Sequence, residues 1–261
     1  MEKTKVVILA GGLGTRLQEE TEFRPKPMVP IGNRPILWHI MKGYSQHGFN
    51  DFIICLGYKG EMIKEYFLNY RFANCDATVH LGTHNRIDYH DNHDEENWTV
   101  TLVNTGIHSM TGARLKKIEK YIQEPYFLMT YGDGVANVNL KKLVDFHLSH
   151  RKIATVTGVK PPSRFGELMI EENQVKQFSE KPQVHQGTIN GGFFVLNREV
   201  FHYLDANNQL IWEHEPMERL AQDKQLMVYS HDGFWQCMDT LRDMRFLNER
   251  WEQGTAPWKI W

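Results

Sequence analysis

The residues best suited to chemistry form a glycine-rich turn close to the N-terminus. An apolar run, Val6–Ala10, leads directly into this turn. The turn holds Gly11, Gly12 and Gly14. Such a run is typical of a strand buried on both faces, and the chain after it must bend tightly. Because the glycines lack Cβ atoms, their amides can point into one concavity and approach a ligand closely. The turn is therefore a candidate anion-binding loop.

Two cations and a hydroxyl group follow the glycines. Thr15 offers a hydroxyl and Arg16 a forked guanidinium, and both bind phosphate oxygens well. Lys26 stands ten residues later, between Pro25 and Pro27, whose rings stiffen the segment. This combination predicts the binding of a triphosphate.

Other kinds of phosphate-binding loop match this sequence less well. A dinucleotide fingerprint, G-x-G-x-x-G, needs a glycine where Leu17 stands. A Walker loop, G-x-x-x-x-G-K-[ST], does not occur in the sequence. A strand-to-helix turn without a ligand is the alternative for this stretch taken alone.

Two carboxylates are candidates for holding a metal ion. Asp133 lies between two glycines, directly after a strand expected at 126–131, and ligands of parallel sheets bind at that end. Mg²⁺ prefers one or two carboxylates together with phosphate oxygens. A helix cap or an Asx turn is the alternative for Asp133. Asp239 precedes a helix expected at 241–251, and its position alone favours the helix N-cap.

Further polar residues have both a functional and an ordinary interpretation. Glu180 and Lys181 place an acid beside a base, for which a solvated surface pair is the ordinary explanation. Asn190 precedes two glycines, which let the backbone approach a ligand or relieve a bulge. Ser109, Thr111 and Arg114 lie in the loop before a helix, where capping would account for the hydroxyl groups.

Composition limits the class of protein. The 261 residues carry a formal charge of −2 and are 41% hydrophobic, enough for one large α/β domain with a sizeable core. This balance argues against a nucleic-acid surface and gives no reason to expect a membrane partner. Three widely spaced cysteines without a C-x-x-C pair are expected to be reduced, as in a cytoplasmic protein. His84, His90 and His93 lack ligand spacing and are expected to be solvated loop residues.

Strands and helices alternate along the first 160 residues, which predicts parallel βαβ units. Strands are expected at 51–56, 75–81, 98–103, 126–131 and 153–159, with helices at 35–48, 60–70, 113–122 and 140–150. Residues 84–97 are expected to form a polar surface excursion. After residue 160, short strands near Glu167, Val175 and 191–196 favour a smaller antiparallel portion, followed by helices near Val200 and Pro216, a strand at 226–230 and a helix at 241–251. No linker separates independent domains.

Motifs along the whole chain resemble those of the sugar-phosphate nucleotidyltransferases. LAGGLGTRL and PKPM are similar to the signature of that family, and RPILWHIMK, DFIICLGYKG, SMTGARLK, YGDGV, EKP, INGGFFVLN and FWQCMDTLRD follow in order. Within the family, the full length resembles the glucose-1-phosphate cytidylyltransferases. The resemblance implies an α/β fold with a mixed, mostly parallel sheet, Rossmann-like and of the nucleotide-diphospho-sugar transferase type. It implies one domain over residues 1–261, with 1–160 mainly binding nucleotide and 161–261 mainly binding sugar phosphate and other subunits.

The resemblance also implies a reaction, in which CTP and α-D-glucose 1-phosphate give CDP-glucose and pyrophosphate. Asp133 and Asp239 would share one Mg²⁺, which overrides the cap expected for Asp239. Arg16, Lys26 and Asp133 would be the catalytic residues. The substrate-binding residues implied are Leu9, Ala10, Gly11, Gly12, Leu13, Gly14, Thr15, Arg16, Lys26, Ser109, Arg114, Gly132, Glu180, Lys181 and Asn190.

By the same resemblance, the protein would be a cytoplasmic homo-oligomer, a hexamer, without nucleic-acid or membrane partners. Its product would serve the dideoxyhexoses of a lipopolysaccharide O-antigen. Three alternatives are weighed against this function. An enzyme using dTTP or UTP would differ only at base-contacting residues. A non-catalytic sugar-nucleotide-binding subunit is disfavoured because Arg16, Lys26, Asp133, Lys181 and Asp239 are all present. An NAD-dependent dehydrogenase is disfavoured by Leu17.

Overall fold

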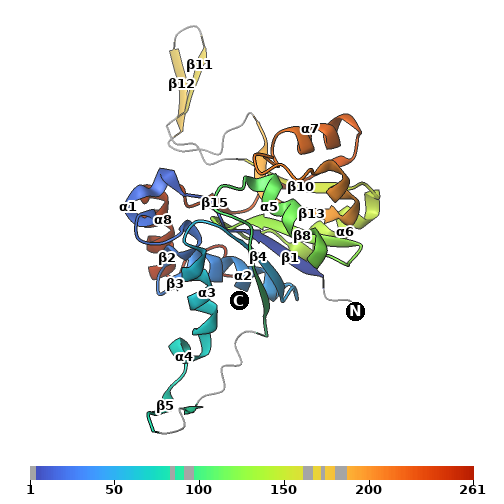
Figure 1. The fold of residues 1–261 in the computed structure, drawn as a ribbon. Helices are drawn as coiled ribbons and strands as arrows, with labels where there is room; N and C mark the ends of the chain where they lie inside the picture. The colour runs from blue at the N-terminus through green and yellow to red at the C-terminus, as the bar shows by residue number, and fades with distance from the viewer. Residues whose placement is uncertain (1–3, 83–85, 91–96, 161–166, 172–173, 180–186) are drawn as a thin grey trace.

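The computed structural model describes residues 4–82, 86–90, 97–160, 167–171, 174–179 and 187–261. Within them, a seven-stranded sheet forms the centre of the molecule (Figure 1). In sheet order, its strands are β14 (Leu226–His231), β10 (Ala154–Val159), β13 (Ile189–Asn197), β8 (Tyr126–Tyr131), β1 (Lys5–Leu9), β4 (Asp51–Leu56) and β7 (Thr99–Asn104). All neighbouring strands run parallel except at β13, which is antiparallel to both β8 and β10. The predicted mixed, mostly parallel sheet is confirmed.

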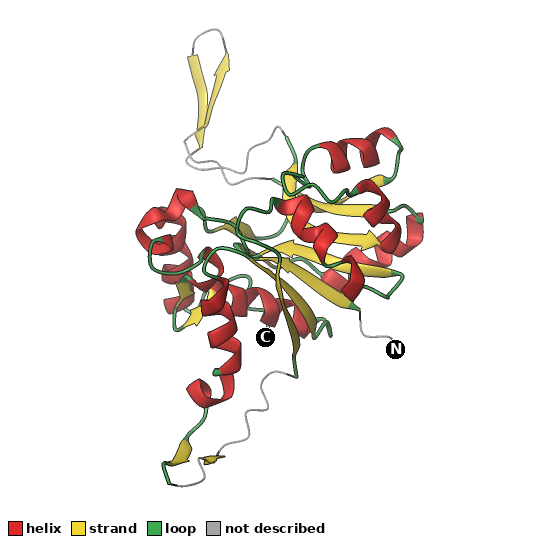
Figure 2. Cartoon of the chain, in the orientation of Figure 1, coloured by secondary structure: helices red, strands yellow, loops and turns green. Residues whose placement is uncertain are grey.

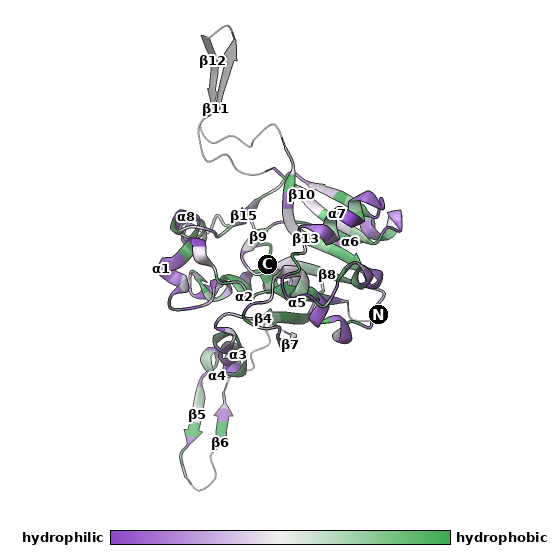
Figure 3. Ribbon diagram, turned by 45° about the horizontal axis from the view of Figure 1, so that its top comes forward, coloured by the Kyte–Doolittle hydropathy of each residue, from purple (hydrophilic) through white to green (hydrophobic). Residues whose placement is uncertain are grey.

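Helices cover both faces of this sheet (Figure 2). Strand β1 shows the cause, because its successive side chains point to opposite faces. Val6 and Ile8 pack in one core cluster, whose α-helical residues come from α2 (Ile36–Gln46), α3 (Gly60–Leu68), α6 (Leu140–His150) and α8 (Leu241–Glu252). Val7 and Leu9 pack in a second cluster with α5 (Thr111–Lys117), the 3₁₀ helix η4 (Arg198–Tyr203) and α7 (Glu215–Gln222). Hydrophobic residues accordingly follow the central strands, and hydrophilic residues the outer helices (Figure 3).

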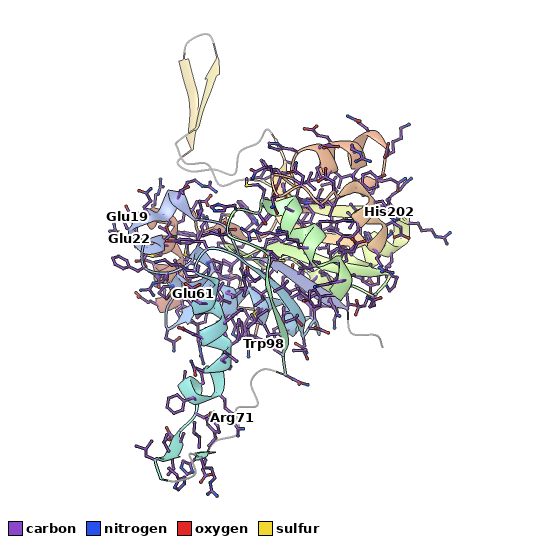
Figure 4. All side chains as sticks on the ribbon, viewed as in Figure 1. Glu19, Glu22, Glu61, Arg71, Trp98 and His202 are labelled. Atoms are coloured by element: carbon purple, nitrogen blue, oxygen red, sulfur yellow. The ribbon has the colours of Figure 1, made fainter. Side chains whose placement is uncertain are left out.

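Shorter elements lie around this sandwich. In the described parts of the chain, four two-stranded ladders pair β2 (Pro30–Ile31) with β3 (Arg34–Pro35), β5 (Ala77–His80) with β6 (Arg86–Tyr89), β9 (Gly134–Ala136) with β15 (Trp235–Cys237), and β11 (Glu167–Glu171) with β12 (Gln174–Ser179). The short helices are η1 (Thr15–Leu17), α1 (Gln18–Thr21), η2 (Lys26–Met28), α4 (Tyr70–Asn74) and η3 (Glu119–Tyr121). On the arm formed by α4, β5 and β6, the Arg71 guanidinium lies 4.3 Å from the centre of the Tyr89 ring (Figure 4).

Several predicted bounds need correction. The helix expected at 60–70 ends at Leu68, because Asn69 leaves the helical region and a separate helix, α4, follows. The helix expected at 113–122 is α5 followed by η3, and the one near Val200 is the 3₁₀ helix η4. The strand expected at 75–81 pairs with β6 instead of joining the central sheet, so part of the expected surface excursion is a strand. His84 and His93 lie outside the described residues, and His90 Nε2 lies 2.7 Å from Thr78 Oγ1.

The three cysteines, Cys55, Cys75 and Cys237, carry free thiols. Burial raises the pKa of Cys55 to about 12, so this thiol stays protonated and packs as an apolar group. Among the described helices, none has the length and hydrophobicity needed to cross a membrane.

The C-terminal tryptophans pack around a buried histidine of α2. The His39 ring is 1% exposed, and its centre lies 4.6 Å from that of Trp251, 6.3 Å from Trp258 and 6.2 Å from Trp261. Its Nε2 lies 2.9 Å from the carbonyl oxygen of Ile31, and Trp258 Nε1 donates to its Nδ1 over 3.4 Å. Because Nδ1 accepts, the ring is neutral with its proton on Nε2. These tryptophans therefore pack around a neutral histidine.

We expect this histidine to make the protein less stable in acid. Burial lowers the pKa of His39 to about 4, from 6.5 in an unfolded chain. Between these values only the unfolded state takes up a proton, so stability present above pH 6.5 is lost as the pH falls towards 4. The loss should reach about 3 kcal/mol. Urea unfolding at pH 7, 5.5 and 4 measures it. His39→Gln keeps a donor for Ile31 and should lose less, and equal losses in the two proteins would contradict this account.

Candidate active site

A cleft of about 750 Å³ opens at the C-terminal ends of β1 and β8. In the sheet, β1 lies between β4, the next central strand in the sequence, and β8, which comes much later. Sheets of α/β proteins bind ligands at the point where the strand order reverses in this way. The cleft is lined by most residues that the sequence predicts for the site, namely Leu9, Ala10, Gly11, Gly12, Leu13, Gly14, Thr15, Arg16, Lys26, Ser109, Arg114, Gly132, Asp133, Asn190 and Asp239. Glu180 and Lys181, also predicted, lie outside the described residues.

The glycine-rich loop is fixed by the segment that follows it. Gly14 has a φ of 66°, a left-handed conformation that favours glycine. The Thr21 hydroxyl donates to the carbonyl oxygens of Gly14 and Leu17, over 3.1 and 2.9 Å. A Cβ atom on Gly14 would lie 2.7 Å from Cγ2 of Thr21. Glycine at this position therefore lets the loop turn back against α1 and towards Lys26.

Lys26 is the central charge of the site. Its Nζ atom lies 2.8 Å from Asp133 Oδ2 and 2.5 Å from Asp239 Oδ1. Arg16 Nη1 lies 2.7 Å from the other oxygen of Asp239, Oδ2. Burial by itself lowers the pKa of Lys26, but the two carboxylates outweigh it and raise the pKa above its usual value. Lys26 is therefore a permanent cation with only 9% of its side chain exposed.

A short ladder brings the two carboxylates together from distant parts of the sequence. Strands β9 and β15 pair antiparallel, with Gly134 opposite Cys237. The Met238 N–H donates to the carbonyl oxygen of Asp133 over 2.8 Å, which continues the pairing by one step. Asp133 and Asp239 thus flank one ladder, and their side chains meet at Lys26.

The helix-cap alternatives for these aspartates are wrong. Thr240 is the N-cap of α8, and it forms a capping box with Asp243. The Asp243 carboxylate also accepts from the Asp239 N–H over 3.1 Å. The Asp239 side chain is therefore not used as a helix cap and can face the cleft. Asp133 is followed by strand β9 rather than by a helix.

The geometry of Asp133 and Asp239 fits a divalent cation bound together with phosphate. Both carboxylates reach one atom, Lys26 Nζ, so they converge on a single cationic position. The described residues contain no cluster of three or more His, Cys, Asp or Glu side chains that could enclose a metal. Two converging carboxylates are the donor set that Mg²⁺ uses when substrate phosphates complete its shell.

Arg114 ties three strand ends together behind the cleft. The residue is 3% exposed, and its guanidinium donates to the carbonyl oxygens of Gly11, Leu56 and Gly106, over 2.8, 3.0 and 2.8 Å. It also donates to Thr105 Oγ1 over 2.7 Å. These groups lie at or just after the ends of β1, β4 and β7, so Arg114 sets the position of the glycine-rich loop relative to the neighbouring strands. Substrate contact by Arg114 stays a prediction.

The hydroxyl groups near Arg114 do not cap α5. The helix begins at Thr111 without a side-chain cap, so the capping interpretation is wrong. Ser109 Oγ donates to the carbonyl oxygen of Thr105 over 2.6 Å. Thr111 Oγ1 donates to Glu213 Oε2, also over 2.6 Å.

Sequence reasoning missed Tyr131 and Glu213, which also line the cleft. Tyr131 donates from its hydroxyl to Glu213 Oε1, and Asn190 Nδ2 donates to the Tyr131 hydroxyl over 3.3 Å. The register between β13 and β10 shifts next to Asn190, so the glycines after it do relieve a bulge, as the ordinary interpretation held. Tyr131 directly precedes Gly132, Asp133 and Gly134, so its place in the sequence could have indicated a role in the site. No local sequence pattern distinguishes Glu213.

We expect the Arg114 anchor to be a main source of stability at this end of the sheet. Arg114→Ala removes charged hydrogen bonds from the carbonyl oxygens of Gly11, Leu56 and Gly106. Gly11 and Leu56 keep backbone donors, from Tyr58 and Thr105, so the loss of the charged bonds should lower the free energy of unfolding by about 3 kcal/mol, measured by urea denaturation. Lys116→Ala is the matched control on the same helix. Its ion pair with Glu119 is partly exposed and should contribute less than about 1 kcal/mol. Similar losses in both variants would show that Arg114 is not a special anchor.

Comparison with known proteins agrees with this geometry. A model of the nucleotidyl transferase family matches residues 5–240. A glucose-1-phosphate cytidylyltransferase of Salmonella typhi is 56% identical over 98% of this chain and 99% of its own length. A probable glucose-1-phosphate cytidylyltransferase of Bacillus subtilis is 45% identical over 98% and 100%. HddC from Yersinia pseudotuberculosis, crystallised with GMP-PN, shares the fold with a TM-score of 0.69 at 23% identity, covering 95% of this chain and 99% of its own. The chain therefore belongs to the nucleotidyl transferase family and, by identity over its whole length, to the glucose-1-phosphate cytidylyltransferases within it.

Proposed function

We propose that this enzyme joins CTP and α-D-glucose 1-phosphate to give CDP-glucose and pyrophosphate. The observation that carries the proposal is the 56% identity, over 98% of the chain, to an enzyme named for this activity. The cleft supports it independently, because it combines a glycine-rich loop, two cations and two converging carboxylates.

The chemical problem in this reaction is the repulsion between anions. A phosphate oxygen of glucose 1-phosphate attacks the α-phosphorus of CTP in line, and pyrophosphate leaves. The nucleophile is already an anion, so neither a general base nor a covalent enzyme intermediate is needed. Catalysis then rests on alignment and on positive charge placed around the phosphates.

Arg16 and Lys26 are the protein side chains that supply positive charge to the phosphates. The Arg16 side chain is 69% exposed in the mouth of the cleft, so it can turn from Asp239 to a triphosphate. Lys26 stays protonated because two carboxylates raise its pKa, and it can exchange one of them for a phosphate oxygen. Asp133 and Asp239 would hold Mg²⁺, which supplies further positive charge to the phosphates when bound.

The remaining assignments follow the same resemblance. Lys181 would hold the sugar phosphate, and Glu180 and Asn190 would contact the sugar. The enzyme would act in the cytoplasm as a homohexamer, with neither nucleic acid nor membrane as a partner. Its product would supply dideoxyhexoses for a lipopolysaccharide O-antigen.

We expect pyrophosphate release from glucose 1-phosphate and Mg²⁺ with CTP, and little with UTP, dTTP or ATP offered in parallel. Release with dTTP or UTP instead would keep the reaction and contradict the base assignment. Folded protein that releases no pyrophosphate with any of the four nucleotides would favour a binding subunit.

We expect Lys26→Ala and Asp133→Asn each to lower kcat by roughly a hundredfold or more, the usual effect of removing one electrostatic stabiliser. Asp145→Asn, at an exposed position on α6, is the control and should leave kcat unchanged. Steady-state pyrophosphate release at saturating CTP and glucose 1-phosphate gives these values. Unchanged turnover in Lys26→Ala or Asp133→Asn would remove that residue from the mechanism.

A further inference from the structure

Glu213 is a carboxylate held in place by two hydroxyl groups at the edge of the cleft. Tyr131 donates to its Oε1 and Thr111 to its Oε2. Thr111 in turn accepts from the Trp212 N–H over 2.9 Å, and Asn190 donates to Tyr131. The hydrogen bonds of this network are therefore all directed towards Glu213. Among the described residues, no cation pairs with it.

The held carboxylate has acceptor capacity to spare. An ionised carboxylate offers about four lone-pair positions, and Tyr131 and Thr111 occupy two of them. Glu213 is half-buried and lines the cleft, so the remaining positions are open to a ligand. Its negative charge would repel phosphate. The group that it receives must therefore be a neutral hydrogen-bond donor, such as a sugar hydroxyl or the amino group of a base.

The position of Tyr131 and Asn190 favours the sugar, rather than the base, as the ligand of Glu213. The glycine-rich loop follows β1, so the nucleotide phosphates belong on that side of the cleft. Tyr131 ends β8 and Asn190 lies at the start of β13, on the other side of β1 from β4 and β7. Tyr131 is also only two residues before Asp133, so their Cα atoms are at most about 7 Å apart. A sugar attached to the attacking phosphate near Asp133 would thus reach Glu213.

We propose that Glu213 accepts a hydrogen bond from a ring or exocyclic hydroxyl of the sugar 1-phosphate, and that Tyr131 and Thr111 are positioning residues that aim its carboxylate. This inference rests on the proposed function and extends it to sugar selection. An acceptor held in a fixed orientation in the cleft disfavours an analogue that lacks the matching hydroxyl, because the lone pair that faces the ligand then loses its donor.

The test compares wild type and Glu213→Gln with glucose 1-phosphate and its 2-, 3-, 4- and 6-deoxy analogues. In the wild type, one deoxy analogue should lose roughly tenfold to a hundredfold in kcat/KM. In Glu213→Gln, kcat/KM for glucose 1-phosphate should fall about tenfold, and the penalty for that same analogue should shrink by a similar factor. KM for CTP and the preference for CTP over UTP should not change.

Two further variants keep the test decisive. Glu215→Gln is the matched control, because this exposed residue pairs with Arg219 outside the cleft, and it should behave as wild type. Tyr131→Phe keeps the edge-on packing against Phe194 but removes one donor to Glu213, so it should reduce the penalty at the same sugar position. It carries the test if Glu213→Gln does not fold.

Three outcomes would overturn the inference. Equal deoxy penalties in wild type and in both site variants would make Glu213 a structural brace between α5 and β8. A changed CTP to UTP preference would make it a base contact. Wild-type protein that releases no pyrophosphate from CTP and glucose 1-phosphate would refute the proposed function itself, and this inference with it.

Discussion

The contact of Lys26 with Asp133 and Asp239 joins three segments that are far apart in the sequence. Lys26 lies on η2, Asp133 follows β8, and Asp239 lies between β15 and α8. Burying a lysine costs free energy unless its charge is paired, and removing one partner of a buried pair usually costs a few kcal/mol. The loop after β1, the turn after β8 and the start of α8 therefore hold one another in place. The same three charges are the ones that phosphate chemistry would use.

The surrounding structure makes this contact possible by occupying competing groups. Thr240 and Asp243 cap α8, which leaves the Asp239 carboxylate available to Lys26. The Arg114 guanidinium links the carbonyl oxygens at the ends of β1, β4 and β7 through charged hydrogen bonds. The residues that hydrogen-bond to the backbone at these positions therefore also fix the loops of the cleft.

Charge is distributed unevenly along the cleft. Arg16 and Lys26 lie beside the glycine-rich loop, whereas Glu213 lies beside Tyr131 and carries no cationic partner among the described residues. A substrate pair with phosphates at one end and hydroxyl groups at the other matches this distribution. The cations favour the anionic part of the ligands, and the carboxylate excludes phosphate from the part of the cleft proposed for the sugar.

The sequence by itself determined the local structure and the phosphate-binding features of this protein. Apolar runs ended by glycine identify the strands at 51–56 and 126–131, and helical spacing identifies the helix at 140–150, because these patterns depend on near neighbours. The tertiary structure alone decided how distant segments meet. It inserted β13 antiparallel between β8 and β10, and it placed Glu213 against Tyr131. No local pattern encodes such contacts, because they depend on strand order and on the packing of segments that lie many residues apart.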